Sequence, residues 1–160
     1  DLELFEQKLE QMGVDIEHLG DDVARVRGPE MLSPINVTTN YYPGFSTDLQ
    51  PGITALATVA DGDSYIRETV FEDRLGHVKS LRAFGAKLSP EKDRLVIVHG
   101  PARLKGERVK ALDIRAGAAC VLAGLAAEGR TSITNLYQLD RGHTRLVERF
   151  TGLGAEIERL

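Results

Sequence analysis

Apolar side chains recur every three or four residues in three separate stretches of the chain, and each stretch ends at a glycine. This spacing places apolar side chains on one face of a helix, so three amphipathic helices are predicted. A glycine directly after the last apolar residue is a typical helix end, because that position favours a left-handed backbone. The apolar positions and closing glycines are Phe5, Leu9, Met12 and Gly13; Val78, Leu81, Phe84 and Gly85; and Leu146, Phe150, Leu153 and Gly154.

The three helix ends are copies of one short motif, followed each time by a β-prone run that is predicted to form a strand. The copies are MGVDI at 12–16, FGAKL at 84–88 and LGAEI at 153–157. Their glycines are 72 residues (85 minus 13) and 69 residues (154 minus 85) apart. A nearly constant period indicates that one supersecondary unit is used repeatedly.

A second element also occurs twice, as TDLQPGI at 47–53 and LDIRAGA at 112–118. Each copy is expected to open a helix, the first ending near residue 60 and the second near residue 127. A glycine and a short strand follow each helix. The predicted strands outside the first motif are 23–26, 35–38, 64–69, 95–98, 109–112 and 131–134.

The repeating unit is therefore helix, strand, helix, strand and one or two further strands, which predicts an α/β (α+β) fold with mixed sheets. The units span about 1–38, 39–108 and 109–160 within one domain portion. Since the first unit holds only its second half, we expect the chain to be the C-terminal part of a longer protein. A half-repeat that caps the N-terminus is the alternative.

Composition narrows the class of protein. The chain has 160 residues, 42% of them hydrophobic, which is typical of a globular protein and not of a disordered one. Its net charge of −4 makes non-specific binding to nucleic acid unexpected. The longest weakly polar run, 116–127, is too short for the roughly 20 apolar residues that span a bilayer. We therefore expect neither nucleic-acid nor membrane binding.

Several kinds of site are also unexpected. The single cysteine, Cys120, excludes an internal disulfide, and its apolar neighbours indicate an inert core thiol. No Gly-x-Gly-x-x-Gly motif or P-loop occurs. The four histidines lack the spacing of metal ligands. No cofactor and no metal are expected.

Asp48 has two interpretations. Thr47 and Gln50 match a capping box, and an acid in the first helical turn is favoured by the helix dipole, so Asp48 needs no function. The preceding loop, 40–46, carries two tyrosines and a phenylalanine around a Pro-Gly turn. These rings either form the wall of a pocket or pack into the core.

Three arginines lie near predicted helix starts. Asp113 is a suitable N-cap, whereas Arg115 places a cation where the helix dipole disfavours it. Arg115 therefore either builds an anion site with free backbone N–H groups or reaches back to Asp113 or another acid. Arg74 and Arg141, 67 residues apart, precede the second helix of each unit. The three side chains either converge on one polyanion or are separate solvated charges.

Four blocks of the chain resemble a known family: YPGFSTDLQ at 42–50, ETVFEDR at 68–74, DIRAGA at 113–118 and DRG at 140–142. In their order and spacing they resemble UDP-N-acetylglucosamine enolpyruvyl transferases (UDP-N-acetylglucosamine 1-carboxyvinyltransferase, MurA family). The resemblance implies transfer of the enolpyruvyl group of phosphoenolpyruvate to the 3-hydroxyl of UDP-N-acetylglucosamine. This is the first committed step of peptidoglycan precursor synthesis, in the bacterial cytoplasm. It also implies an inside-out α/β barrel of repeated βαβαββ units, incomplete here, with substrates between two domains.

The resemblance assigns roles to individual residues. Asp48 corresponds to the proposed base for the sugar hydroxyl, and Asp113 to a second acid at the reaction centre. Val70 corresponds to a residue near the N-acetyl group, and Phe71 follows it. Basic residues around the carboxylate and phosphate of phosphoenolpyruvate correspond to Arg74, Arg115 and Arg141.

Two parts of the family's active site have no counterpart here. The loop that carries a catalytic Cys or Asp belongs to the family's N-terminal portion, and Cys120 does not match it. The Lys and Arg from the other domain are also absent, so we expect this chain alone to be inactive. His143 stands where a Tyr is common.

Three alternatives remain open. The first is the sister enzyme that acts on 3-phosphoshikimate, although the loop 42–48 favours the UDP-sugar branch. The second is a non-catalytic binding module of the same fold. The third is a fragment that associates with itself through an exposed sheet edge.

Overall fold

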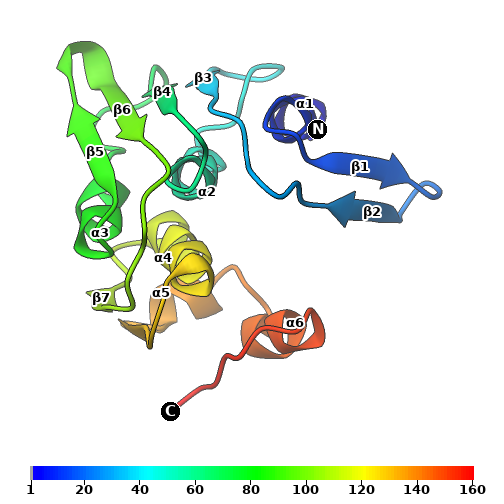
Figure 1. The fold of residues 1–160 in the computed structure, drawn as a ribbon, viewed down its shortest axis with the longest axis vertical. Helices are drawn as coiled ribbons and strands as arrows, with labels where there is room; N and C mark the ends of the chain where they lie inside the picture. Colours follow the sequence, from blue (N-terminus) through cyan, green and yellow to red (C-terminus); the bar gives the residue numbers. More distant parts are fainter. Residues whose placement is uncertain (1) are drawn as a thin grey trace.

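The computed structural model describes residues 2–160 and confirms an alternation of helices and short strands (Figure 1). The elements, in chain order, are α1 (Glu3–Gln11), β1 (Asp15–His18), β2 (Ala24–Arg27), β3 (Asn36–Thr38), α2 (Gln50–Ala57), β4 (Asp63–Arg67), α3 (His77–Ala83), β5 (Lys87–Pro90), the 3-10 turn η1 (Lys92–Arg94), β6 (Leu95–His99), β7 (Arg108–Lys110), α4 (Ile114–Ala126), β8 (Ser132–Thr134), α5 (Tyr137–Asp140) and α6 (Leu146–Gly152).

The predicted helix ends are confirmed at all three copies of the motif. The closing glycines of α1, α3 and α6 have φ angles of 94°, 91° and 92°, which an L side chain rarely adopts. The residue after each of these glycines donates its N–H to the carbonyl five residues earlier, as Val14 does to Leu9 and Ala86 to Leu81. These bonds satisfy carbonyls that the helix end leaves free.

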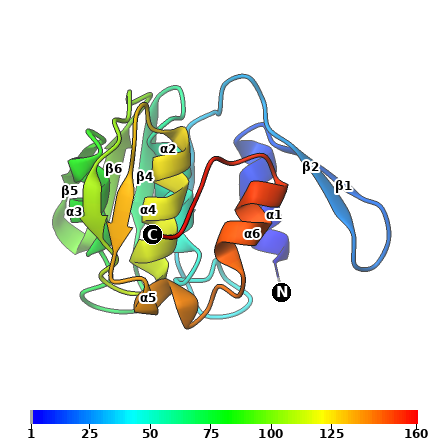
Figure 2. The same cartoon turned by 90° about the horizontal axis from the view of Figure 1, so that it is seen from below.

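The strands form three separate sheets. The largest has the order β3-β4-β6-β5, in which only β3 and β4 are parallel. The strands β1 and β2 form an antiparallel hairpin that projects away from this sheet (Figures 1 and 2). The strands β7 and β8 form a parallel pair. Because α2 joins β3 to β4 and α4 joins β7 to β8, residues 2–160 contain two parallel βαβ crossovers. Residues 2–160 form no closed barrel.

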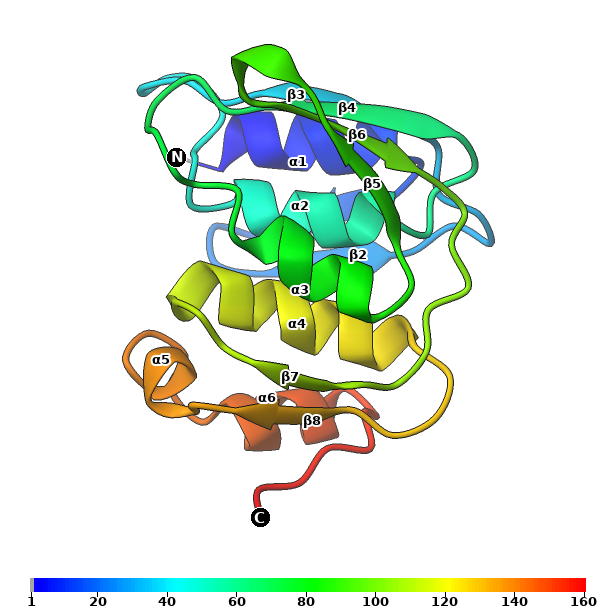
Figure 3. The same cartoon turned by 90° about the vertical axis from the view of Figure 1, so that its left-hand side faces the viewer.

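The helices α2, α3 and α4 lie beneath the four-stranded sheet in a succession of layers, with β7 and β8 beyond α4 (Figure 3). Both α2 and α4 are apolar on several sides, as expected of buried helices. Ile53 of α2, Phe84 after α3 and Cys120 of α4 are fully buried in one core. Burial also raises the pKa of the Cys120 thiol, which confirms it as a core residue.

Two predictions about the last unit are wrong. The run 153–157 is not a strand, because no strand of the described chain pairs with it, whereas β1 pairs with β2 and β5 with β6. The chain instead continues without regular structure after α6. In addition, the short helix α5 was not predicted and precedes Arg141. No helix of residues 2–160 is long and apolar enough to cross a membrane.

Candidate active site

The loop before α2 packs one of its three aromatic rings into the core, and none of the three lines the cavity beside Asp48. Phe45 is buried and packs against Phe5 of α1, with ring centroids 6.2 Å apart. Tyr41 and Tyr42 are exposed. The buried ring fixes the loop to the core, and Asp48 follows three residues later in the turn that leads into α2.

The predicted capping box at the start of α2 does not form. The hydroxyl of Thr47 donates to Oε2 of Glu68 at 2.7 Å and caps no backbone N–H. The side chain of Gln50 is buried and has no hydrogen-bond partner among the described residues. The Thr47 hydroxyl is therefore bonded to a residue 21 positions away in the sequence. Asp48 lies in the turn just before α2 and not in the first turn of the helix.

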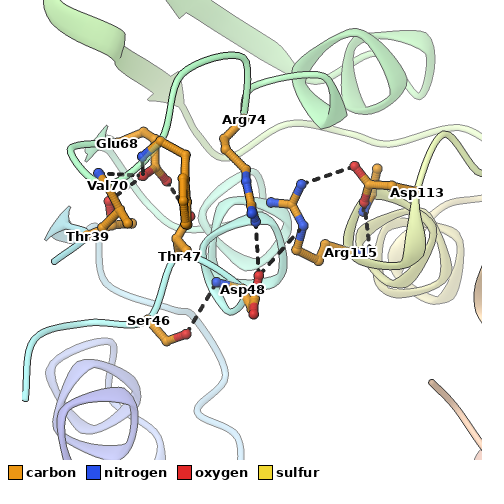
Figure 4. A network of polar contacts seen from close by, with 11 residues as sticks. Thr39, Ser46, Thr47, Asp48, Glu68, Val70, Arg74, Asp113 and Arg115 are labelled. Carbon is orange, nitrogen blue, oxygen red and sulfur yellow. Dashed lines mark hydrogen bonds and ion pairs between the residues drawn. The ribbon is translucent and has the colours of Figure 1, made fainter. Parts of the chain in front are cut away.

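Asp48 is the centre of a chain of charges drawn from three parts of the sequence (Figure 4). Its Oδ1 lies 3.0 Å from Nη1 of Arg74 and 3.8 Å from Nε of Arg115. The other end of the Arg115 guanidinium donates to Oδ2 of Asp113 at 3.1 Å. Even so, 69% of the Asp48 side chain is exposed, so its carboxylate remains open to a ligand.

Asp113 and Arg115 confirm the simpler interpretation made from sequence, in which Asp113 is the N-cap and Arg115 reaches back to it. Oδ1 of Asp113 caps α4 by accepting from the backbone N–H of Arg115 at 2.8 Å and of Ala116 at 2.9 Å. Arg115 does reach back to Asp113, as the simpler interpretation required. However, its side chain is only 16% exposed, and its buried Nη1 has no hydrogen-bond partner in the described chain. Among residues 2–160, Arg115 therefore keeps one unpaired donor beneath the surface of the site.

Glu68 holds the two loops that form this group and was missed as a site residue. Its carboxylate is fully buried and accepts hydrogen bonds from the hydroxyls of Thr39 and Thr47 and from the amides of Val70 and Phe71. Burial alone raises the pKa of Glu68, but these hydrogen bonds outweigh it and bring the pKa below its usual value. The sequence did contain a signal for this role, because Glu68 lies within a segment predicted to be a strand. An acid that is buried there requires hydrogen-bond donors around it.

Phe71 connects this carboxylate to the charged group. The guanidinium of Arg74 lies over its ring, 4.3 Å from the centroid, as in a cation–π contact. The ring itself is exposed and is not part of the lining of the cavity beside Asp48. Val70 is half-buried beside it.

Arg141 does not join the other two arginines. It follows α5 and does not start α6, so its expected place at a helix N-terminus is wrong. In the described chain its guanidinium lies 5.8 Å from the Tyr137 ring centroid and 3.5 Å from Oε1 of Gln138. Two residues later, His143 does line the same cavity as Asp48.

The charged group opens onto a cavity of about 580 Å³ between α2 and α4. Asp48, Arg74 and Arg115 form its polar part. The remaining lining is His143 with the mainly apolar Phe5, Leu49, Gly52, Leu56, Ile114, Ala118 and Leu122. Residues 2–160 contain no group of three acidic, Cys or His side chains arranged to hold a metal ion. The arrangement can accept a proton at Asp48 and bind an anion at the two arginines.

Comparison with curated proteins gives relatives along nearly the whole chain. It is 47% identical over 153 residues to a UDP-N-acetylglucosamine 1-carboxyvinyltransferase of Thermobifida fusca, covering 95% of this chain and 35% of that protein. It is 46% identical over 158 residues to UDP-N-acetylglucosamine 1-carboxyvinyltransferase 2 of Geobacillus kaustophilus, covering 99% and 36%. The chain therefore spans about a third of the length of these relatives.

Solved structures agree with this result. The enolpyruvyl transferase NikO from Streptomyces tendae matches with a TM-score of 0.87 and 35% identity, over 98% of this chain and 36% of that one. EPSP synthase from Acinetobacter baumannii shares the fold alone, with a TM-score of 0.62 and 22% identity over 80% of this chain and 31% of that one. The family model described as EPSP synthase (3-phosphoshikimate 1-carboxyvinyltransferase) matches residues 1–150. The chain belongs to this family of enolpyruvyl transferases.

Proposed function

We propose that this chain forms one side of the active-site cleft of a UDP-N-acetylglucosamine 1-carboxyvinyltransferase. Such an enzyme moves the enolpyruvyl group of phosphoenolpyruvate to the 3-hydroxyl of UDP-N-acetylglucosamine, for peptidoglycan synthesis in the bacterial cytoplasm. Support comes from relatives of that name at 46–47% identity. The rest of the cleft, including the loop with a catalytic Cys or Asp, is then supplied by an N-terminal part of the same enzyme.

One observation carries the proposal: an exposed carboxylate, that of Asp48, lies between two guanidinium groups. The reaction needs a base for the acceptor hydroxyl beside fixed cations for a substrate with carboxylate and phosphate groups. Asp48 meets the first need, and Arg74 and Arg115 meet the second. Nη1 of Arg115 is buried and unpaired within the described chain, so a bound anion that displaces its neighbours would give it an acceptor.

The chemical steps assign a role to each side chain. Asp48 accepts the proton of the 3-hydroxyl as its oxygen attacks C2 of phosphoenolpyruvate, while C3 gains a proton from an acid on the other side of the cleft. Phosphate then leaves C2, and loss of a proton from C3 restores the double bond. Arg74 and Arg115 stabilise the negative charge of the carboxylate and phosphate during both steps. Asp113, whose oxygens accept from three N–H groups, holds Arg115 in place.

The remaining assignments concern the edge of the site. Val70 and Phe71 are proposed to contact the N-acetyl group of the sugar, since both follow the strand that ends beside Asp48. Arg141 is proposed to reach the phosphate when substrate is bound. Its present contacts, with Gln138 and Tyr137, are on the surface and exchange at little cost.

Phosphate release from phosphoenolpyruvate plus UDP-N-acetylglucosamine tests the proposal. The chain is assayed alone and together with the N-terminal part of a relative, and release is expected only in the mixture. Asp48→Asn should reduce turnover about 100-fold or more, as loss of a general base does. Asp61→Asn, at an exposed acid in the turn after α2, is the matched control and should retain turnover.

Other outcomes identify the alternatives. Turnover with shikimate 3-phosphate in place of the UDP-sugar would assign the acceptor named in the family model. A non-catalytic binding module would be favoured by a folded complex that releases no phosphate with either acceptor. In that case Asp48→Asn should also leave the affinity for the ligands unchanged. Concentration-dependent association of the chain alone would indicate pairing through an exposed sheet edge.

A further inference from the structure

We infer that Glu68 is a positioning residue, which fixes Asp48 and Arg74 relative to each other. Its buried carboxylate binds both loops that carry these residues, and we call this set of hydrogen bonds the clamp. The inference rests on the proposed function, because it concerns the placement of the proposed base and its cationic neighbour. Glu68 touches neither the cavity nor the charged group directly. It acts through the residues that bind its two carboxylate oxygens.

The clamp has one arm for each loop. Among residues 2–160, Oε2 of Glu68 accepts only from Thr47, at 2.7 Å, and Thr47 directly precedes Asp48. Oε1 accepts from the amides of Val70 at 2.8 Å and Phe71 at 3.1 Å, which belong to the loop that carries Arg74. A third bond to Oε1, from the hydroxyl of Thr39 at 2.9 Å, attaches the clamp to the end of β3 (Figure 4).

These contacts form a closed circuit. From Glu68 it runs through Thr47 to Asp48, across the 3.0 Å ion pair to Arg74, and over the cation–π contact to Phe71. The amide of Phe71 then returns it to Glu68. Every link between loops is a hydrogen bond, an ion pair or a ring contact, so moving one arm displaces Asp48 relative to Arg74.

The carboxylate must be ionised for this role, because all four groups that face it are donors in this arrangement. Those donors also keep its pKa below the usual value despite burial. An ordinary core residue at this position would leave two amides and the Thr47 hydroxyl without partners, and the Thr39 hydroxyl without an acceptor. Burying a carboxylate costs free energy, and this carboxylate contacts both loops of the site. Its presence is best explained if it keeps these two loops in a fixed position relative to each other.

Two matched variants separate positioning from stability. Thr47→Val and Thr39→Val each delete one buried hydroxyl that donates to Glu68, with nearly the same shape retained. Only Thr47 adjoins Asp48, while Thr39 also accepts from the amide of Thr69 at 2.9 Å. If Glu68 contributed stability alone, Thr39→Val would be at least as harmful as Thr47→Val.

The first measurement uses the 160-residue chain and requires no activity. In ¹H–¹⁵N spectra, Thr47→Val should shift the side-chain N–H signals of Arg74 and Arg115, which face Asp48, and Thr39→Val should move them far less. Glu68→Gln should shift both signals and also the amide of Phe71. Equal shifts of the Arg74 and Arg115 signals in the two threonine variants would overturn the inference.

The second measurement uses the reconstituted enzyme. A misplacement of about 1 Å costs about 100-fold in rate, so Thr47→Val should lower kcat by about 10- to 100-fold with little change in KM, and Thr39→Val much less. The effects of Thr47→Val and Glu68→Gln should be non-additive, because both break the same arm. Equal kcat losses in both threonine variants would refute positioning. If the unaltered enzyme shows no turnover, the proposed function fails, and the spectra still test the clamp.

Discussion

His77 is expected to make the folded chain sensitive to mild acid. It opens α3 with its ring only 2% exposed, and Nε2 has no hydrogen-bond partner among the described residues. Burial first and the charge of Arg115 second lower the pKa of His77 from 6.5 to about 4. A backbone hydrogen bond with Arg74 and the charges of Asp113 and Glu68 oppose this only in part.

The sign and size of the effect follow from proton linkage. Between pH 6.5 and about 4 the unfolded chain holds a proton on His77 that the folded chain does not, so the free energy of unfolding falls as the pH falls. Each pKa unit is equivalent to about 1.4 kcal/mol, so the contribution lost across this range is about 3 kcal/mol. Above pH 6.5 it is fully present, and below pH 4 no more is lost.

Urea unfolding at a series of pH values, from about 7.5 down to about 4, measures this contribution. In His77→Gln the free energy of unfolding should fall about 3 kcal/mol less over that range than in the unaltered chain. His143→Gln, at a half-buried histidine between α5 and α6, is the control and should follow the unaltered chain. If His77→Gln shows the same pH dependence as the unaltered chain, His77 is not held neutral by burial and Arg115.

Two further predictions concern stability. Phe84→Ala should lower the free energy of unfolding by about 3–5 kcal/mol, because the ring is 0% exposed in the core. Tyr42→Ala, at a ring 82% exposed, should change it by less than about 0.5 kcal/mol, and comparable losses would contradict the assigned core. Asp113→Ala should cost about 1 kcal/mol by removing the cap of α4, measured by thermal unfolding. Asp113→Asn, which retains an acceptor for the cap, should cost less, and an equal cost would show that the charge matters and the cap does not.

Several features of the fold were predictable because they depend on neighbours within one helical turn. The spacing of Phe5, Leu9 and Met12 placed one face of α1, and the glycines that follow α1, α3 and α6 marked where each helix ends. The N-cap role of Asp113 was likewise local, since its partners are two and three residues away. The same holds for the contact of Arg115 with Asp113.

The candidate site depended on the sequence in a different way. Asp48, Arg74, Arg115 and Asp113 were singled out by their places near predicted helix starts and were given roles by resemblance, and the first three meet in the structure. Their distances and the unpaired donor of Arg115 were not predictable, because the charges come from segments 26 and more residues apart. For the same reason the sequence left open whether Arg141 joins this group, and the structure separates it.

By itself the sequence determined every described helix except α5, the ends of α1, α3 and α6, the repeat and the chemical types available for a site. Tertiary structure alone decided which partner a polar group took when that partner is distant in sequence. The hydroxyl of Thr47 had a capping position three residues ahead, yet it bonds to Glu68, 21 residues away. Residues 153–157 match the segments that lead into β1 and β5, yet they form no strand. A buried carboxylate requires donors wherever the chain can bring them, and a strand requires a paired strand, so both outcomes depend on contacts between distant segments.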